Sequence, residues 1–117
     1  MFFPEGLVRV FLHGAPTDMR KSFDGLSAMT RQVLQEDPLS GSLFVFFNRR
    51  RTQMKVLYWD RSGYCVWSKR LERGRFVSRG DGVKQALSFT QLKLLLEGIE
   101  LKNMRQHKRF SLRALAT

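Results

Sequence analysis

Residues 43–69 read LFVFFNRRRTQMKVLYWDRSGYCVWSK, and this stretch decides the fold. It holds three segments rich in β-branched and aromatic residues, separated by short polar turns, which is the pattern of an antiparallel meander. The three expected strands are residues 43–47, 54–59 and 64–69. Asp60 and Gly63 begin and end the second turn, with the residue types that a type I turn prefers. At least two of the three large ring side chains are expected in the core of this sheet: Tyr58, Trp59 and Trp67.

A strand and a helix are predicted on the N-terminal side of the meander. The segment Leu7–Leu12 is β-branched and aromatic, which predicts a strand, and the sequence leaves open whether it pairs with the meander. A helix follows, since apolar and small residues recur there at helical spacing: Phe23, Leu26, Thr30, Val33 and Leu34. Three residues are candidate caps for this helix: Thr17, Asp18 and Ser22. The helix is expected to end at Asp37, because the residue ahead of a proline is displaced from helical geometry.

A second helix is predicted on the C-terminal side. Ser88 and Gln91 stand three residues apart and form a capping-box pattern. The helix that they begin has one apolar face: Leu92, Leu95, Leu96 and Ile99. Gly98 is expected to end it. Ahead of this helix, Arg75–Val77 predicts one more short strand.

The elements combine into one small α+β domain. We expect an antiparallel β-meander of three to five strands with two helices over residues 1–100. Residues 101–117 form a basic C-terminal extension that contains no acidic side chain. Either a basic helix or a flexible arm that orders on a phosphate backbone fits this composition.

The charge is large and unevenly distributed. The 117 residues carry a formal charge of +11, which indicates a nucleic-acid partner, although a basic surface that only aids solubility would give the same total. The balances are −1 over residues 1–47, +8 over residues 48–79 and +4 over residues 80–117. Charge concentrated in one third of the chain favours a binding face.

Candidate DNA-binding residues lie mainly in this middle third. The guanidinium fork of arginine matches phosphate, and three consecutive arginines in a hairpin loop can project together. A second group follows the third strand, interleaved with Trp67 and Phe76. The candidate nucleic-acid-binding residues are Arg20, Arg49, Arg50, Arg51, Lys69, Arg70, Arg73, Arg75, Arg79, Lys108 and Arg109.

The composition argues against a catalytic or metal centre. Most of the five Asp and five Glu have a local structural role, so no carboxylate set for metal-dependent cleavage is predicted. Cys65 is the only cysteine, so it cannot form an intramolecular disulfide, and with His13 and His107 it cannot complete a four-ligand zinc site. Its place in an apolar strand predicts a buried residue rather than a nucleophile. We expect no cofactor, no metal, no membrane association and a cytoplasmic location.

Four blocks in order along residues 6 to 100 resemble a known family. They are residues 17–21 (TDMRK), residues 37–46 (DPLSGSLFVF), residues 69–76 (KRLERGRF) and residues 95–99 (LLEGI). The sequence resembles the accessory TnpB proteins encoded by the second reading frame of the insertion sequence sixty-six family. The resemblance implies a bacterial transposable-element protein that works beside a separately encoded transposase, with no catalytic residues of its own.

Charge and resemblance together predict a non-catalytic accessory factor for DNA transposition. It would bind DNA through a basic face, largely by backbone contacts, and assist the transposase. The alternative is a protein interaction module that docks on the transposase without binding DNA. No helix-turn-helix, zinc-finger or basic-zipper pattern is present, so no base preference is predicted. The sequence leaves the oligomeric state open.

Overall fold

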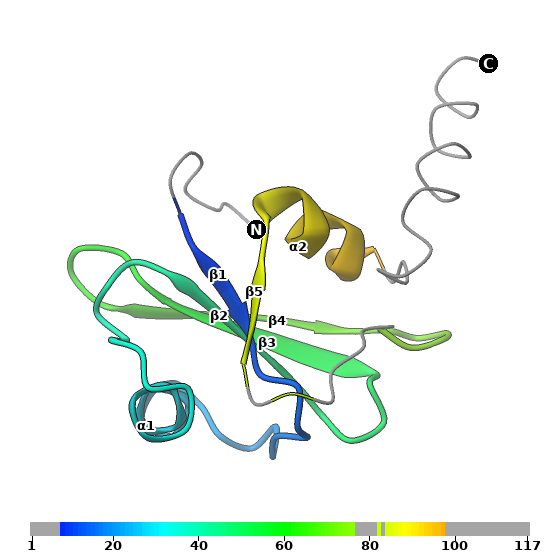
Figure 1. The fold of residues 1–117 in the computed structure, drawn as a ribbon. Helices are drawn as coiled ribbons and strands as arrows, with labels where there is room; N and C mark the ends of the chain where they lie inside the picture. The colour runs from blue at the N-terminus through cyan, green and yellow to red at the C-terminus, as the bar shows by residue number, and fades with distance from the viewer. Residues whose placement is uncertain (1–7, 77–81, 83, 98–117) are drawn as a thin grey trace.

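A five-stranded sheet with one helix on each face forms the centre of the computed structural model, which describes residues 8–76, 82 and 84–97 (Figure 1). The strand order is β4-β3-β2-β1-β5. In chain order the elements are β1 (Val10–Leu12), α1 (Phe23–Gln32), β2 (Leu43–Phe47), β3 (Gln53–Trp59), β4 (Tyr64–Arg70), β5 (Gln85–Leu87) and α2 (Phe89–Leu96). The α+β prediction is confirmed. The predicted extension, residues 101–117, lies outside the described residues.

The predicted meander is present as β2, β3 and β4. The two antiparallel pairings are as expected, and the strand bounds differ from the prediction by at most one residue. The prediction of a type I turn between β3 and β4 was wrong. Arg61 has a φ of +82°, where a type I turn requires a negative value. The N–H of Asp60 donates to the carbonyl of Gly63 at 3.1 Å. A positive φ at a hairpin tip suits the right-handed twist of the strands.

The strand on the N-terminal side pairs with the meander. β1 is parallel to β2, with Val10 opposite Leu43, and α1 forms the long connection that a parallel pair requires. On its other side β1 pairs with β5 in the antiparallel sense. The prediction of a strand at Arg75–Val77 was wrong for Arg75 and Phe76, which lie outside any strand. Phe76 instead buries its ring against Phe47, with 5.6 Å between the ring centroids. Val77 lies outside the described residues.

Helix α1 begins as expected and ends early. Ser22 occupies the N-cap position but makes no side-chain cap hydrogen bond. The predicted end near Asp37 was wrong, because Gln35 adopts a φ of +55° and reverses the chain just after the C-cap Val33. The N–H of Glu36 then donates to the carbonyl of Thr30 at 3.1 Å. Of the predicted apolar stripe, Leu26, Thr30 and Leu34 are buried, whereas Phe23 and Val33 are 46% and 40% exposed.

Helix α2 has the predicted capping box. The hydroxyl of Ser88 accepts from the N–H of Gln91 at 3.0 Å, and the side chain of Gln91 accepts from the N–H of Ser88 at 2.8 Å. Leu92 and Leu95 are fully buried against the sheet. Gly98 and Ile99, the other predicted members of this helix, lie outside the described residues. None of the described helices is long and apolar enough to cross a membrane.

The sheet has a separate hydrophobic core on each face, because side chains alternate along each strand. The α2-side core is built on Val10, Leu12, Leu43, Val45, Phe47, Met54, Val56, Phe76, Leu87, Leu92 and Leu95. The α1-side core is built on Leu26, Leu34, Phe44, Phe46 and Leu57. Tyr58 and Trp67 pack against the α2-side core, as predicted for two of the three large aromatic residues. Each face of the sheet therefore has its own buried core, and the loops lie at the two ends of the strands.

Candidate nucleic-acid interface

Two loops lie side by side at one end of the sheet. The β2–β3 loop, residues 48–52, is joined to the segment after β4, residues 71–76, by two backbone hydrogen bonds. The N–H of Leu71 donates to the carbonyl of Thr52 at 2.8 Å, and the N–H of Phe76 donates to the carbonyl of Arg51 at 2.6 Å. The arginines of the loop and those beyond β4, about twenty residues apart in sequence, are therefore neighbours in space.

The β2–β3 loop is held in one shape by its own side chains. The side-chain oxygen of Asn48 accepts from the N–H groups of Thr52 and Gln53 at 2.9 and 3.0 Å, and its amide donates to the Thr52 hydroxyl at 3.0 Å. Arg51 adopts a φ of +60°, which closes the turn. The loop presents its exposed arginines from a fixed backbone, so less conformational entropy is lost on binding than from a flexible loop.

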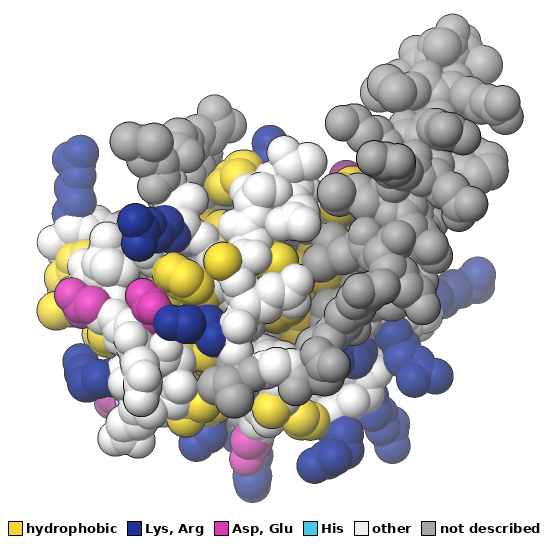
Figure 2. Space-filling model, in the orientation of Figure 1, with side chains coloured by type: hydrophobic (Ala, Val, Ile, Leu, Met, Phe, Trp, Pro, Cys, Tyr) yellow, Lys and Arg dark blue, Asp and Glu magenta, His cyan; other side chains and the backbone are white. Residues whose placement is uncertain are grey.

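Five arginines are exposed on these loops and at the adjoining end of β4. We call them the basic end: Arg49, Arg50, Arg70, Arg73 and Arg75. Lys and Arg side chains gather in this region of the surface, at the lower right of the molecule (Figure 2). Arg70 pairs with Glu72 at 3.2 Å, but both side chains are more than 70% exposed, so the pair is weak and open to competition by phosphate.

Arg51 does not project with its neighbours, so the prediction of three arginines pointing outward together was wrong. Its guanidinium donates to the carbonyl of Gly14 at 2.7 Å and lies 4.9 Å from the centre of the Phe47 ring. Burial lowers the pKa of this guanidinium. Arg51 ties the β2–β3 loop to the segment after β1 and is a structural residue here.

Replacing Arg51 with Ala is expected to lower the free energy of unfolding by about 2 kcal/mol, because a charge-assisted hydrogen bond and a cation–π contact are both lost. Chemical denaturation followed by tryptophan fluorescence measures the change. Arg50→Ala is the matched control, since Arg50 is exposed and its loss is expected to cost less than about 0.5 kcal/mol. Equal unfolding midpoints for the two variants would contradict the structural role of Arg51.

The side chains of Lys69 and Arg20 also make hydrogen bonds to groups of the protein itself. The ammonium of Lys69 donates to the carbonyl of Leu96 at 2.6 Å, where a cation complements the C-terminal end of α2. Arg20 makes a bidentate ion pair with Asp18, in which the shortest distance, from Nη2 to Oδ2, is 2.7 Å. The Arg20 side chain nevertheless remains 92% exposed. The hydrogen bonds from Arg20 lower the pKa of Asp18 to about 2, so the Asp18 carboxylate stays ionised beside Arg20. Asp18 is therefore an ion-pair partner and does not cap α1.

The remaining candidates fall outside the described part of the chain. They are Arg79, Lys108 and Arg109. Their assignment stays a prediction.

The aromatic residues near the basic end belong to the core. Phe76 is 1% exposed, and Trp67 packs against the α2-side core. The basic end therefore offers cations without stacking rings, which suits contacts to a phosphate backbone more than contacts to bases.

The described residues do not bring together a metal-ligand cluster or a pair of Cys65 with His13. Within residues 8–76, 82 and 84–97, no three His, Cys, Asp or Glu side chains gather where they could hold a metal ion. Cys65 is half-buried rather than buried as predicted, and desolvation raises the pKa of its thiol. Cys65 stands opposite Tyr58 on the α2 side of the sheet, whereas His13 packs on Phe46 on the α1 side. They cannot form a nucleophile–base pair across the sheet.

A second pair of exposed arginines was missed in the sequence. Arg9 and Arg61 lie at the end of the sheet opposite the basic end, beside the turn between β3 and β4. The charge pattern of the sequence did not indicate these two arginines as a pair, because they are 52 positions apart in the chain. Only the parallel pairing of β1 with β2 places Arg9 at that end.

Comparison with known proteins identifies relatives over most of the chain. Residues 8–106 match the family described as IS66 Orf2 like protein. A protein of Sinorhizobium fredii named y4hO, described as uncharacterized, is 42% identical over 97 residues, covering 82% of this chain and 84% of its own length. A second protein of that organism, y4jC, also described as uncharacterized, is 35% identical over 77 residues, or 66% of each chain. No solved structure matches.

Proposed function

This chain belongs to the IS66 Orf2-like family of insertion-sequence accessory proteins, and from that premise we propose that it binds DNA through the basic end and assists a separately encoded transposase. The accessory role in transposition follows from the family. DNA binding and the link to the transposase are the steps proposed here.

The observation that carries the proposal is the grouping of five exposed arginines on two hydrogen-bonded loops and the adjoining end of β4. Their forks donate parallel hydrogen bonds to phosphate, and each neutralised phosphate releases counterions. Among the described residues of these loops, Glu72 is the one opposing charge. The sign, density and exposure of the charge all favour a polyanion.

Binding is expected to be largely independent of base sequence. Both helices pack on the faces of the sheet, with Leu26 and Leu92 buried in the two cores, so the described elements include no free recognition helix for the major groove. Contacts from loop arginines to phosphates position a protein on DNA without reading bases. The role that fits is holding or bridging DNA in the transposase complex, with the chemistry left to the transposase.

The proposal is tested by fluorescence anisotropy of the purified full chain with a duplex of the element end and with a scrambled duplex of equal length. We expect binding of both duplexes at low salt, with affinities within about threefold of each other. A strong preference for the element end would contradict the backbone-contact mechanism. No binding at about 50 mM salt, together with co-purification of the chain and its transposase, would replace the proposal with a protein-docking role.

A further inference from the structure

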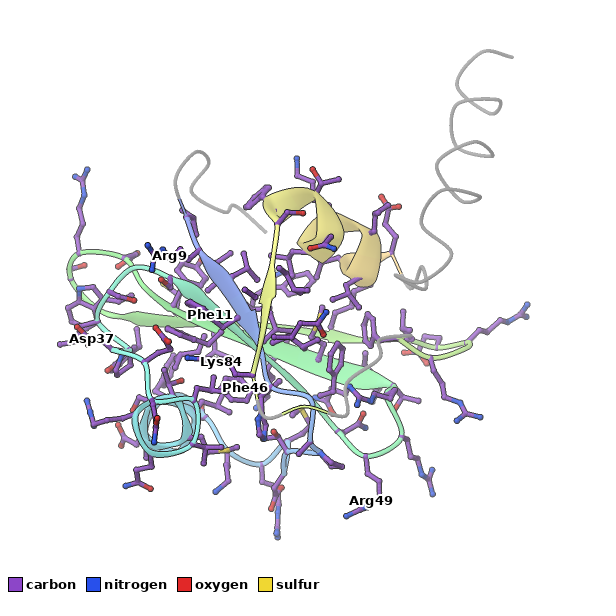
Figure 3. The ribbon with its side chains drawn as sticks, in the orientation of Figure 1. Arg9, Phe11, Asp37, Phe46, Arg49 and Lys84 are labelled. Carbon is purple, nitrogen blue, oxygen red and sulfur yellow. The ribbon has the colours of Figure 1, made fainter. Side chains whose placement is uncertain are left out.

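Strand β4 forms one edge of the sheet, and no described strand pairs with its outer side. It runs from the end of the sheet marked by Arg9 to the basic end, marked by Arg49 (Figure 3). The other edge strand, β5, has three residues, whereas β4 has seven. An exposed edge can pair with a further strand, and a short edge strand is one way in which proteins prevent such pairing. Strand β4 is therefore the edge that can accept a partner.

The hydrogen bonds on the inner side of β4 identify the backbone groups on its outer side. At one end of the β3–β4 pair, the N–H of Asp60 donates to the carbonyl of Gly63 at 3.1 Å. At the other end, the N–H of Leu71 donates to the carbonyl of Thr52 at 2.8 Å. Backbone groups alternate between the two sides of a strand in an antiparallel sheet, so the odd-numbered residues of β4 bond to β3. Four residues direct both N–H and C=O outward: Tyr64, Val66, Ser68 and Arg70.

Strand β4 lacks the features that usually keep an edge strand from pairing. It pairs one-to-one with β3 along its whole length, so no bulge bends it away, and it contains no proline. Its first four residues, Tyr64–Trp67, are uncharged and only half-buried. The two cations of the strand, Lys69 and Arg70, lie at its end. The first half of the edge is therefore apolar on both faces of the sheet.

The edge is complementary to an antiparallel second copy of itself. The four outward-facing residues lie symmetrically about Trp67. A two-fold axis at Trp67 pairs Val66 with Ser68 of the second copy. It also pairs Tyr64 with Arg70 of the second copy. Every outward N–H and C=O of both strands then has a hydrogen-bond partner, which no other register achieves.

The side chains suit the same register. Trp67, which packs on the α2-side core, stands opposite Trp67 of the second copy, and cross-strand aromatic pairs stabilise antiparallel sheets. Lys69 stands opposite Cys65 and Arg70 opposite Tyr64, so each cation faces an uncharged residue. The two Arg70 residues are separated by about 20 Å, at roughly 3.4 Å per residue, so like charges are kept apart. The charge pattern of the edge therefore fits a second copy of this chain.

We propose that the protein forms a two-fold symmetric dimer in which β4 pairs with β4 of a second copy, joining two five-stranded sheets into one continuous sheet. The dimer has its two basic ends at opposite ends of the joined strands, at least about 20 Å apart. One dimer can therefore hold two segments of DNA at once. This last consequence rests on the proposed DNA binding, whereas the dimer itself does not.

Sedimentation equilibrium of the full chain without DNA tests for the dimer. We expect twice the monomer mass at about 100 µM protein and dissociation on dilution. Val66→Pro removes an outward N–H and leaves the bonds to β3 intact, so the sheet is expected to tolerate it. The loss of two hydrogen bonds per dimer is expected to raise the dissociation constant roughly thirtyfold. Val66→Thr, the matched control, keeps the N–H and is expected to change the constant less than about threefold.

A natural chain that is monomeric at every concentration would overturn the inference and leave the edge to a strand of another protein. Equal dissociation constants for Val66→Pro and Val66→Thr would overturn it as well, because the dimer would then form through another surface.

A cysteine variant tests the register without relying on proline. Lys69→Cys places a thiol opposite Cys65 of the second copy, in a pair without hydrogen bonds whose Cα atoms are about 4.5 Å apart, within disulfide range. Within one copy the two positions are about 14 Å apart, too far to bridge. Mild oxidation is expected to give a covalent dimer, with the link between positions 65 and 69 identified by mass spectrometry. Lys93→Cys, on α2, is the matched control and is expected to stay uncrosslinked. Equal crosslinking of the two variants, or no link between positions 65 and 69, would overturn the proposed pairing.

Capture of a labelled duplex by a bead-bound duplex separates the dimer from the proposed DNA binding. The natural chain is expected to bridge the two duplexes. Val66→Pro is expected to lose bridging while it binds a single short duplex within about threefold of the natural affinity. A monomeric natural chain that binds DNA removes this inference alone, whereas a dimer that does not bind DNA removes the role of the basic end alone.

Discussion

Replacing the five arginines of the basic end with serine is expected to weaken duplex binding by roughly 10⁴-fold at about 0.1 M salt. Each phosphate contact contributes a salt exponent of about 0.9, which corresponds to roughly eightfold in affinity at that concentration. The five substitutions are Arg49→Ser, Arg50→Ser, Arg70→Ser, Arg73→Ser and Arg75→Ser. All five side chains are exposed, so the variant is expected to remain folded, with a circular dichroism spectrum like that of the natural chain. Fluorescence anisotropy measures the loss.

A smaller pair of variants separates position from total charge. Arg49→Ser with Arg50→Ser is expected to weaken binding roughly fiftyfold. Arg31→Ser with Lys93→Ser removes the same charge from the exposed surfaces of α1 and α2 and is expected to weaken binding less than about threefold. Equal losses for the two pairs would show that net charge, and not the basic end, governs binding.

Phe46→Ala is expected to lower the free energy of unfolding by about 3–5 kcal/mol. The Phe46 ring is fully buried in the α1-side core and lies 6.1 Å from the imidazole of His13, measured between ring centroids. Its removal leaves a cavity between the central strand β2 and α1 that a rigid sheet cannot close. Because small domains have only about 5–15 kcal/mol of stability, this variant is expected to be close to unfolding. Urea denaturation followed by circular dichroism measures the change.

Phe23→Ala is the matched control for Phe46→Ala. Phe23 begins α1 and is 46% exposed, so its truncation is expected to cost about 1 kcal/mol or less. Both variants remove the same phenyl ring, one from a fully buried site and the other from a half-exposed site. A stability loss for Phe46→Ala no larger than that for Phe23→Ala would contradict the position of β2 at the centre of two cores.

The meander was predictable because local signals determine it. Three apolar runs joined by short polar turns allow few other arrangements, and the capping box at Ser88 is a local pattern as well. The predictions that failed concern elements whose form depends on contacts between residues far apart in the chain. Strand β5 is three residues long with two exposed positions, so it has no pattern of its own and forms by pairing with β1. The early end of α1 depends on a positive φ at Gln35, a residue type that gives little warning of one.

The sequence predicted where the arginine-rich surface lies, but it did not predict which of the individual arginines and lysines are exposed on that surface. Charge clustering located a surface rich in arginine, because most of the clustered arginines fall in the polar segments that join or follow the predicted strands. The sequence could not separate Arg50 from Arg51, since the difference depends on the carbonyl of Gly14, 37 positions away. The same holds for Lys69, whose partner is the end of a helix 27 positions later. Adjacent arginines with the same propensity thus have different roles, and only tertiary contacts assign them.

The central claim, that the basic end binds DNA through phosphate contacts, is tested most directly by the salt dependence of duplex affinity. The dissociation constant is measured by anisotropy between about 50 and about 200 mM salt for the natural chain and for the five-arginine variant. Five phosphate contacts predict a logarithmic slope of about 4.5 or steeper for the natural chain and a slope lower by about 4.5 for the variant. A slope near zero for the natural chain, or the same slope for both proteins, would contradict the account.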